Sequence, residues 1–237
     1  VDPETGRVLI TPRGPDPILC GIRGESPESV RKAFRMLSIR EPVDAWMIFR
    51  TNQGTDAHLV RNFFISELQD NCAVVVEATV AEKPRTIPGG HVILRLRDET
   101  GSVSCAAYEP TGKFRDVVRR LEPGDRVRAF GGMRAASDEI PPTLNLEKLE
   151  ILELAACERA RNPICSVCGK RMKSAGRTQG FRCKRCATHD VAKTRTTVQR
   201  DLQVGTYLPP PRAHRHLTKP RVRYDREHLG VNYPPAL

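Results

Sequence analysis

The sequence predicts an α+β protein built from several small domains, and three observations support this prediction. The chain of 237 residues is long enough for two or three domains. Apolar residues alternate at the β-strand period through its middle third, and two cysteine pairs with metal-binding spacing follow. The expected segments are an α+β unit over 1–70, a β-barrel over 71–155, a zinc ribbon over 156–200 and a basic, proline-rich tail over 201–237.

The composition indicates a soluble protein of a reducing compartment. Mean hydropathy is −0.44, no apolar run approaches the roughly 18 residues of a membrane span, and no signal sequence opens the chain. We therefore expect a cytoplasmic protein without a membrane partner. Cys20, Cys72, Cys105 and Cys157 are scattered and are expected to be free thiols. Because the chain begins at Val1 without an initiator Met, we expect a fragment.

Positive charge is concentrated at the carboxyl-terminal end. Residues 1–70 and 71–154 each carry a net charge of −1, whereas residues 155–237 carry +13, which gives +11 for the whole chain. Such a concentration is typical of proteins that bind a polyanion, most often nucleic acid. A basic surface that serves only solubility is the alternative, but this charge exceeds what solubility requires.

The pairs Cys165–Cys168 and Cys183–Cys186 predict a structural zinc site. Two Cys-x-x-Cys turns separated by fourteen residues can supply four thiolates to one tetrahedral zinc. Two roles are open for it: zinc that only holds a small fold together, or zinc that holds a fold presenting a basic surface to a ligand. The candidate nucleic-acid-binding residues of this segment are Lys170, Arg171, Lys173, Arg177, Arg182, Lys184 and Arg185.

Residues 18–50 are predicted to form a β-α-β unit. Residues 18–22 and 45–49 are short apolar runs expected to be strands. Between them Ser26 is a good helix N-cap, Pro27 suits the first helical position, and apolar residues follow at helical spacing. One such unit is too small for a domain and would be half of a larger α+β domain.

Two polar segments follow the expected strands, where α/β units commonly build their sites. Arg23 and Arg50 could hold phosphate, and Asp56 could accept a cationic group. Spacing alone favours ordinary capping and turn roles for them. The candidate substrate-binding residues are Gly21, Arg23, Gly24, Arg50, Asn52, Gln53 and Asp56. No residue pattern identifies a catalytic group.

Residues 72–154 are predicted to form three strands, a helix and two strands, because apolar residues alternate with polar ones in the strands and recur at helical spacing in the helix. Thr111 is expected to cap the helix, and the fifth strand, near residues 144–151, is expected to contain a bulge. This order is that of an OB-fold, a five-stranded barrel that commonly binds oligonucleotides. Candidate contact residues are Arg95, Arg97, Arg128 and Phe130. The alternative is a barrel with a purely structural role, which the segment's net charge of −1 supports.

The remaining segments carry weaker patterns. Residues 155–161 are predicted to be a short helical link, and residues 193–198 a further strand. His214 and His216 are better explained as a solvated or phosphate-facing patch than as metal ligands. His189 could compete with Cys186 for zinc, although four cysteines already complete a tetrahedron.

Several motifs together resemble one family. They are Gly-Ile-Arg-Gly at 21–24, Phe-Arg-Thr-Asn-Gln-Gly-Thr-Asp at 49–56, the OB-fold pattern, the four-cysteine ribbon and Arg-His-Leu-x-Lys-Pro at 215–220. In this order they resemble the carboxyl-terminal half of archaeal tRNA agmatidine synthetase. The resemblance implies an ATP-dependent ligase that joins agmatine to the wobble cytidine of an isoleucine tRNA, so that the tRNA reads AUA.

The resemblance also implies a division of labour. The first unit would be part of a ferredoxin-like domain, and the kinase-like domain that uses ATP and magnesium would lie outside this chain. The chain would supply tRNA binding and one wall of the agmatine site, and would be inactive alone. A nonenzymatic single-strand-binding protein and a zinc-stabilised module that docks on an acidic protein remain alternatives.

Overall fold

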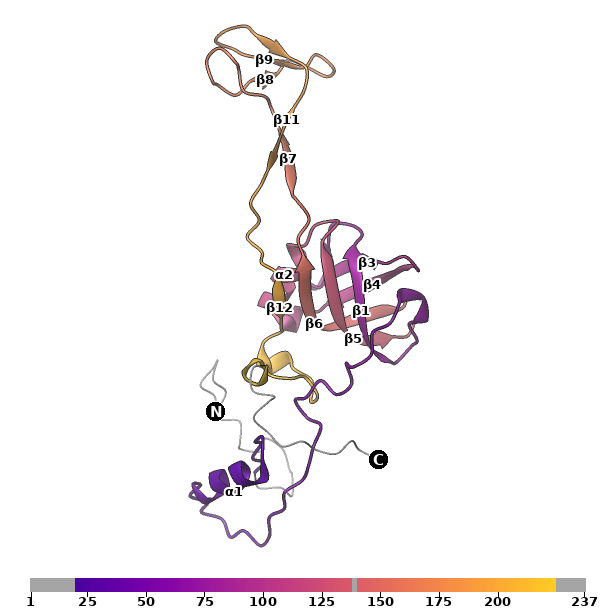
Figure 1. The fold of residues 1–237 in the computed structure, drawn as a ribbon, viewed down its shortest axis with the longest axis vertical. Coiled ribbons are helices and arrows are strands. Elements are labelled where there is room, and N and C mark those ends of the chain that lie inside the picture. Colours follow the sequence, from indigo (N-terminus) through magenta and orange to yellow (C-terminus); the bar gives the residue numbers. More distant parts are fainter. Residues whose placement is uncertain (1–19, 138–139, 225–237) are drawn as a thin grey trace. The chain divides into compact units, whose positions relative to one another are not determined.

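The computed structural model describes residues 20–137 and 140–224, which belong to two compact units (Figure 1). One unit comprises the described residues 20–52 and 219–224, and the other comprises the described part of 53–218. Among the described residues, no helix combines the length and the apolar character of a membrane span.

The larger unit contains the expected five-stranded barrel. Each strand pairs with two others, and the order β1-β5-β6-β4-β3 closes through a pairing of β1 with β3. The β4–β6 pair is parallel and the other pairs are antiparallel. The strands are β1 (Ala73–Val80), β3 (Val92–Arg97), β4 (Ser102–Ala107), β5 (Arg126–Arg134) and β6 (Thr143–Glu153), with a short β2 (Arg85–Thr86) paired to β3. The OB-fold prediction is confirmed.

Alternation of apolar residues produces the barrel core. Along β3, Val92, Leu94 and Leu96 are fully buried while the intervening residues are partly or fully exposed. Helix α2 (Lys113–Arg119) adds Phe114 and Val118 to the same core.

The start of helix α2 differs from the prediction. Thr111 is not its cap: it ends the 3-10 helix η2 (Glu109–Thr111), where its hydroxyl donates to the Tyr108 carbonyl. Gly112, with a φ of 52°, is the N-cap of α2. A backbone with this φ favours glycine, so the chain turns into the helix one residue later than the threonine suggested.

The predicted bulge lies in β6, next to a glycine in β5. Pairing passes from Phe130–Lys148 to Gly131–Leu146, which leaves Glu147 as an extra residue. A Cβ on Gly131 would lie 2.0 Å from the Asn145 carbonyl oxygen, so the strands can approach this closely only at glycine. The bulge turns Glu147 and Lys148 toward chain segments outside the barrel.

A buried carboxylate joins the barrel to the chain that returns after the cysteines. Asp125 is fully buried, and its two oxygens accept hydrogen bonds of 2.5 and 2.7 Å from the Arg200 guanidinium. The same oxygens accept the backbone N–H groups of Glu122 and Ala155. Hydrogen bonding with Asp125 raises the pKa of Arg200. Asp125 therefore fixes both ends of the segment from 155 to 200.

That segment begins and ends in a two-stranded ribbon rather than a helix. β7 (Glu158–Arg161) pairs with β11 (Thr194–Thr197), so the helical link predicted over 155–161 is wrong, and the strand predicted over 193–198 is confirmed. The outgoing and returning arms satisfy each other's backbone groups, which overrides the weak helical preference of so short a stretch. Between them lie β8 (Lys173–Ser174), β9 (Phe181–Arg182) and β10 (His189–Asp190).

The tail also contributes to the larger unit. Residues of β12 (Gly205–Tyr207) pair with β6, extending the barrel sheet. The other short elements are the 3-10 helices η1 (Ile65–Glu67), η3 (Pro211–Ala213) and η4 (Arg221–Arg223), the last of which belongs to the smaller unit.

The smaller unit contains the predicted helix without the predicted strands. Helix α1 (Pro27–Arg35) begins at Ser26, whose side chain accepts the Ser29 N–H. Residues 20–22 and 45–49 are not in strands, and residues 18–19 lie outside the described chain. A strand needs a paired neighbour, and none is present among the described residues of this unit. Consequently Trp46 and Phe49 are 56% and 73% exposed.

We predict that Gly131→Ala destabilises the barrel by about 1–3 kcal/mol, because the new methyl group must displace backbone at the bulge. Gly132→Ala is the matched control, since its Cβ would meet no atom closer than 3.5 Å. Urea unfolding followed by circular dichroism measures both. Equal stabilities of the two variants would contradict the close approach of the strands.

We also predict that Arg200→Met lowers the free energy of unfolding by about 3–5 kcal/mol, because it leaves the buried Asp125 carboxylate without its cation. Arg120→Ala is the control, since Arg120 pairs with a fully exposed Asp201 and such surface pairs contribute little. Thermal and urea unfolding should separate the two variants clearly. If Arg200→Met lost no more stability than the control, the buried Asp125 carboxylate would not depend on Arg200.

Candidate nucleic-acid interface and metal centre

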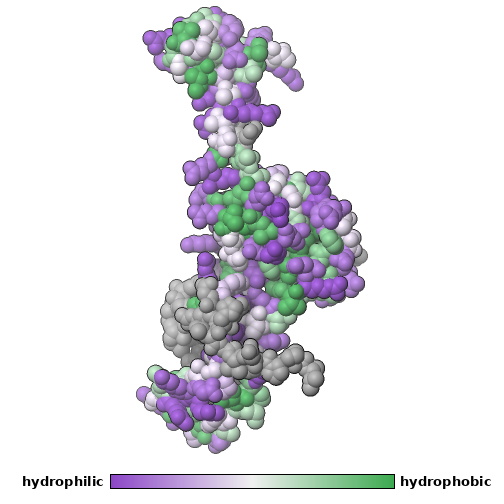
Figure 2. Space-filling model, viewed as in Figure 1, coloured by the Kyte–Doolittle hydropathy of each residue, from purple (hydrophilic) through white to green (hydrophobic). Residues whose placement is uncertain are grey.

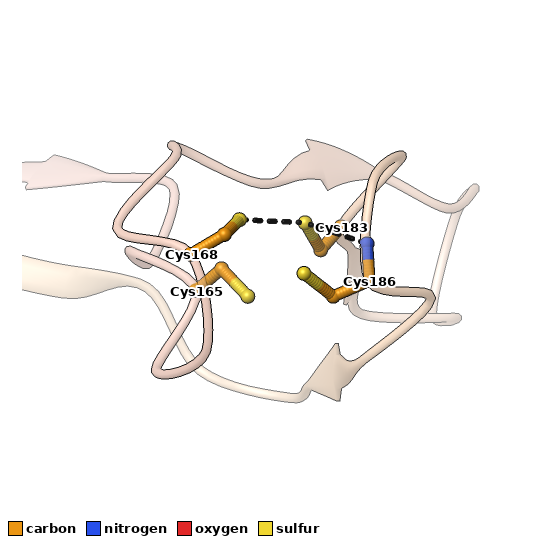
Figure 3. Close-up of side chains that lie close together, drawn as sticks. All are labelled: Cys165, Cys168, Cys183 and Cys186. Carbon is orange, nitrogen blue, oxygen red and sulfur yellow. Dashed lines mark hydrogen bonds between the residues drawn. The ribbon is translucent and has the colours of Figure 1, made fainter.

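The four cysteines of the ribbon converge on one point, although they come from two turns separated in sequence. Their sulfur atoms all lie within 4.8 Å of one another, and their side chains point inward (Figure 3). Cys165 and Cys183 are buried together with Met172 and Phe181 in a small core. The cluster is the one group of this kind found in the described chain.

The two cysteine turns have the same backbone geometry. The N–H of Gly169 donates to the Cys165 carbonyl, and the N–H of Ala187 donates likewise to Cys183. Gly169 and Ala187 both have positive φ, at 68° and 55°. The sulfurs of Cys168 and Cys183 are 3.6 Å apart, close to the roughly 3.8 Å expected for two thiolates on a tetrahedral zinc with bonds of about 2.3 Å.

The electrostatics of the cluster also favour a bound cation. Hydrogen bonding with Thr188 and with nearby backbone N–H groups lowers the pKa of Cys165 to about 6. Hydrogen bonding with the Cys168 sulfur, burial and charge repulsion raise the pKa of Cys186 to about 12. Four adjacent thiolates repel each other, and a divalent ion removes this repulsion. The cysteines form a structural zinc site.

The ribbon presents its basic residues to solvent. All seven that the sequence predicted as nucleic-acid contacts are exposed: Lys170, Arg171, Lys173, Arg177, Arg182, Lys184 and Arg185. Arg171 also donates to the Asn162 carbonyl at 2.8 Å. Hydrophilic residues form much of the visible margin of the ribbon (Figure 2). Asp190 is the one acidic residue in the sequence from Cys165 to Lys193, so the ribbon surface is strongly cationic.

The four candidate residues of the barrel differ in their surroundings. Arg95 and Arg97 are exposed on β3, and Arg95 donates to the Ser102 hydroxyl. The Lys148 ammonium lies 4.2 Å from the centre of the Phe130 ring. The Phe130 ring therefore already contacts a cation of the same chain.

Arg128 is likewise engaged within the protein. It is half-buried between Glu77 and Glu150, at 3.0 and 2.8 Å. Hydrogen bonding with Glu77 raises the pKa of Arg128, and hydrogen bonds from Arg126 and Arg128 lower the pKa of Glu77. Of the four barrel candidates, only Arg95 and Arg97 are thus exposed on the surface.

The bulge in β6 organises a second cluster that sequence reasoning missed. One Glu147 oxygen lies 2.9 Å from His58 Nε2, and the other accepts a 2.9 Å hydrogen bond from Arg215. The neighbouring Lys148 donates to Asp56 at 2.6 Å. Two of the family motifs, at 49–56 and 215–220, therefore meet at the bulge. The adjacent glycines at 131–132 within a strand are the sequence signal that could have indicated this close approach.

Backbone hydrogen bonds reinforce this meeting point. The N–H of Gly54 donates to the His216 carbonyl at 3.0 Å, and that of Asp56 donates to the Leu217 carbonyl at 2.9 Å. A cavity of about 520 Å³ lies beside these contacts. Its lining includes Asn71, Gly132, Arg134, Asn145, Glu147 and Arg215.

The predicted substrate-binding residues are divided between the two units. Gly21, Arg23 and Gly24 are in the smaller unit, which also contains Arg50 and Asn52. Gln53 and Asp56 belong to the larger unit.

Asp56 accepts a cationic group, and that group comes from the same chain. Its carboxylate is only 12% exposed and binds the Lys148 ammonium. The φ of Asp56 is 56°, a left-handed conformation that aspartate tolerates in turns. Lys148 is therefore a cationic partner of Asp56 within the described chain.

We predict one zinc per chain, released as the pH falls because protons compete for the thiolates. Cys168→Ser should abolish zinc binding and unfold the ribbon while the barrel persists. Cys157→Ser, which removes a thiol outside the cluster, is the control. Metal analysis and near-ultraviolet circular dichroism report the two effects. Full zinc content in Cys168→Ser would contradict the four-thiolate site.

Comparisons with known protein families match three consecutive parts of the chain. Residues 1–58 match the TiaS FLD domain, residues 74–152 an OB-fold nucleic acid binding domain, and residues 162–202 the TiaS C-terminal zinc ribbon domain. The second and third matches agree with the barrel and the four-cysteine ribbon seen in the structure.

Individual proteins are also similar to this chain. The 2-agmatinylcytidine synthetases TiaS of Methanosarcina mazei and Methanopyrus kandleri, which act on an isoleucine tRNA, are 46% and 44% identical, over 98% and 100% of this chain. The chain spans only 53% and 55% of their lengths. A solved complex of TiaS with this tRNA and ATP is 44% identical, with a TM-score of 0.76 over 93% of this chain and 50% of that one. The chain is thus a homologue of the archaeal tRNA 2-agmatinylcytidine synthetases TiaS and corresponds to their carboxyl-terminal half.

Proposed function

We propose that this chain is the tRNA-binding portion of an ATP-dependent ligase that joins agmatine to the wobble cytidine of isoleucine tRNA. The observation that carries the proposal is the exposed basic surface of the zinc-held ribbon, on a chain 44% identical to a protein solved with its tRNA and ATP. Lysine and arginine side chains of this kind bind phosphates without reading sequence, and the counterions they release contribute much of the affinity.

Zinc has an indirect role in this function. It holds two turns that would otherwise separate, and it thereby keeps the basic residues on both turns at fixed positions. Binding of zinc and binding of tRNA are coupled because an unfolded ribbon would lose this arrangement. The barrel is the second contact surface, and Arg95 and Arg97 are the exposed cations among its candidate residues.

The chemistry with ATP and magnesium is assigned to a part of the enzyme outside this chain. The chain spans 53% and 55% of the lengths of two related synthetases, so about half of each lies outside the match, and a related TiaS structure contains tRNA, AMPCPP and agmatine. We propose that residues 21–24 and 50–52, which belong to the smaller unit, contribute to the site for agmatine and the cytidine. The chain alone binds tRNA and does not incorporate agmatine. A cytoplasmic location follows from the proposed substrate.

We predict that reversing the charges of Lys170, Arg171 and Lys173 together weakens binding of isoleucine tRNA at least about ten-fold at roughly 0.15 M salt, with zinc content unchanged. The slope of log affinity against log salt should fall in magnitude by about 3, one for each lost phosphate contact. Fluorescence anisotropy with labelled tRNA measures both quantities.

The matched control exchanges the same residues for the other basic type, as Lys170→Arg, Arg171→Lys and Lys173→Arg, and should keep most of the affinity. Unchanged affinity and slope after charge reversal would show that zinc merely stabilises the ribbon. In that case the tRNA contacts would lie elsewhere on the chain.

A further inference from the structure

We propose that Thr188 is a positioning residue of the metal centre: its hydroxyl donates a hydrogen bond to the Cys165 thiolate and thereby strengthens zinc binding by the four cysteines. Thr188 is not one of the four ligands and lies two positions after the last of them in the sequence. The inference concerns how firmly the ribbon holds zinc. It goes beyond the proposed function and does not depend on tRNA binding.

The contact between Thr188 and Cys165 is short and well placed. Thr188 Oγ1 lies 3.0 Å from Cys165 Sγ, although the two residues are 23 positions apart in the chain. A thiolate has no proton to donate, so the hydroxyl is the donor whenever Cys165 is ionised. Cys165 is buried, and a hydrogen bond to a charged group in such surroundings is stronger than a neutral one in water. The hydroxyl therefore stabilises the form of Cys165 that binds a metal ion.

Thr188 contacts one ligand in each of the two cysteine turns. Its backbone carbonyl accepts the N–H of Cys183 at 2.9 Å, within the second turn. Its hydroxyl contacts Cys165, which belongs to the first turn. One residue thus holds the two turns together through contacts made by the protein itself. Such preorganisation reduces the ordering entropy that metal binding must otherwise overcome.

The first turn shows that the backbone does not require threonine at this position. The N–H of Cys165 donates to the Lys170 carbonyl at 2.9 Å, just as the N–H of Cys183 donates to the Thr188 carbonyl. Lys170 is therefore the counterpart of Thr188 in the first turn. Its side chain is exposed and belongs to the basic surface of the ribbon. The two equivalent positions differ in role, because one holds a cysteine ligand and the other presents a cation.

The hydroxyl of Thr188 is also distinct from the other donors at the cluster. The N–H of Cys186 lies 3.5 Å from Cys183 Sγ, and this contact is made by backbone within one turn. Among the described residues, Thr188 is the one side chain outside the cluster that hydrogen-bonds to a cysteine sulfur. Backbone N–H groups remain after a side chain is replaced. A substitution at Thr188 therefore removes a single, identifiable contact to the metal ligands.

The test uses variants that separate the hydroxyl of Thr188 from its methyl group. Thr188→Val keeps the shape of the side chain and removes the hydroxyl. Thr188→Ser keeps the hydroxyl, and Thr188→Ala differs from it by that one oxygen atom. Thr196→Val is the matched control, because Thr196 is exposed on β11 and valine suits a strand. Zinc affinity of the full chain is measured at constant pH by competition with a chromophoric zinc chelator.

We expect Thr188→Val and Thr188→Ala to weaken zinc binding about 10–100-fold, as is typical when a group that hydrogen-bonds to a metal ligand is removed. Thr188→Ser should keep most of the wild-type affinity, and Thr196→Val should keep all of it. The comparison of Ser with Ala stays informative even if valine disturbs the fold of the ribbon, because these two variants share the same loss of the methyl group.

A spectrum of the Co²⁺-loaded chain distinguishes a contact to the thiolate from a general effect on folding. The sulfur-to-cobalt charge-transfer absorption depends on electron density at the sulfur ligands, which a donated hydrogen bond lowers. We expect this absorption to move to longer wavelength in Thr188→Val and Thr188→Ala. It should stay at the wild-type position in Thr188→Ser and Thr196→Val.

Three results would overturn the proposal. Wild-type zinc affinity in Thr188→Val would show that the hydroxyl does not contribute. Equal losses in Thr188→Ser and Thr188→Ala would assign the effect to the methyl group and hence to packing. Weaker zinc binding with an unchanged cobalt spectrum would show that Thr188 acts through the fold of the ribbon and not through Cys165. The affinity of the zinc-loaded wild-type chain for tRNA, measured separately, decides the proposed function.

Discussion

The ion pair between Asp125 and Arg200 is the constraint on which the organisation of the larger unit depends. Asp125 lies in the turn before β5, is fully buried, and also accepts the backbone N–H groups of Glu122 and Ala155. One carboxylate therefore holds the barrel turn, the chain after β6 and the chain returning from the zinc ribbon. A buried charge is tolerated there because both oxygens have partners, and loss of one partner is correspondingly costly.

Glu147 repeats this arrangement at the bulge of β6. It binds His58 and Arg215, while the neighbouring Lys148 binds Asp56. Acidic residues of the barrel thus hold arginines from the ribbon's flank and the tail, so part of the basic excess is neutralised within the protein. The seven exposed cations of the ribbon keep a high positive charge at the surface, where the phosphates of the proposed RNA ligand would reach them.

The elements that were predicted correctly are those that short-range sequence patterns specify. Apolar residues at every second position predicted the barrel strands, and cysteine spacing predicted the zinc site. The predictions for residues 45–49 and 155–161 were wrong because strand formation depends on a partner elsewhere in the chain. The former has no such neighbour among the described residues, and part of the latter pairs with 194–197.

The cluster at the bulge could not be predicted from the sequence for a related reason. Lys148 and Asp56 are 92 residues apart in the chain, and Glu147 and Arg215 are 68 apart. No periodicity connects positions at such separations, so only the folded barrel brings them together. Arg128 and Phe130 show the same limit. Their outward positions on β5 were predictable, but their contacts with Glu77 and Lys148 were not.

The central proposal is that a ribbon and a barrel, joined through buried carboxylates, recognise a folded tRNA. Competition between isoleucine tRNA and an unstructured single-stranded RNA of equal length, at roughly 0.15 M salt, tests it most directly. We predict that folded tRNA displaces the single strand at a concentration at least about ten-fold lower than the reverse, because a preorganised surface matches a preorganised ligand. Equal competition, or preference for the single strand, would contradict this and favour a protein that coats single-stranded nucleic acid.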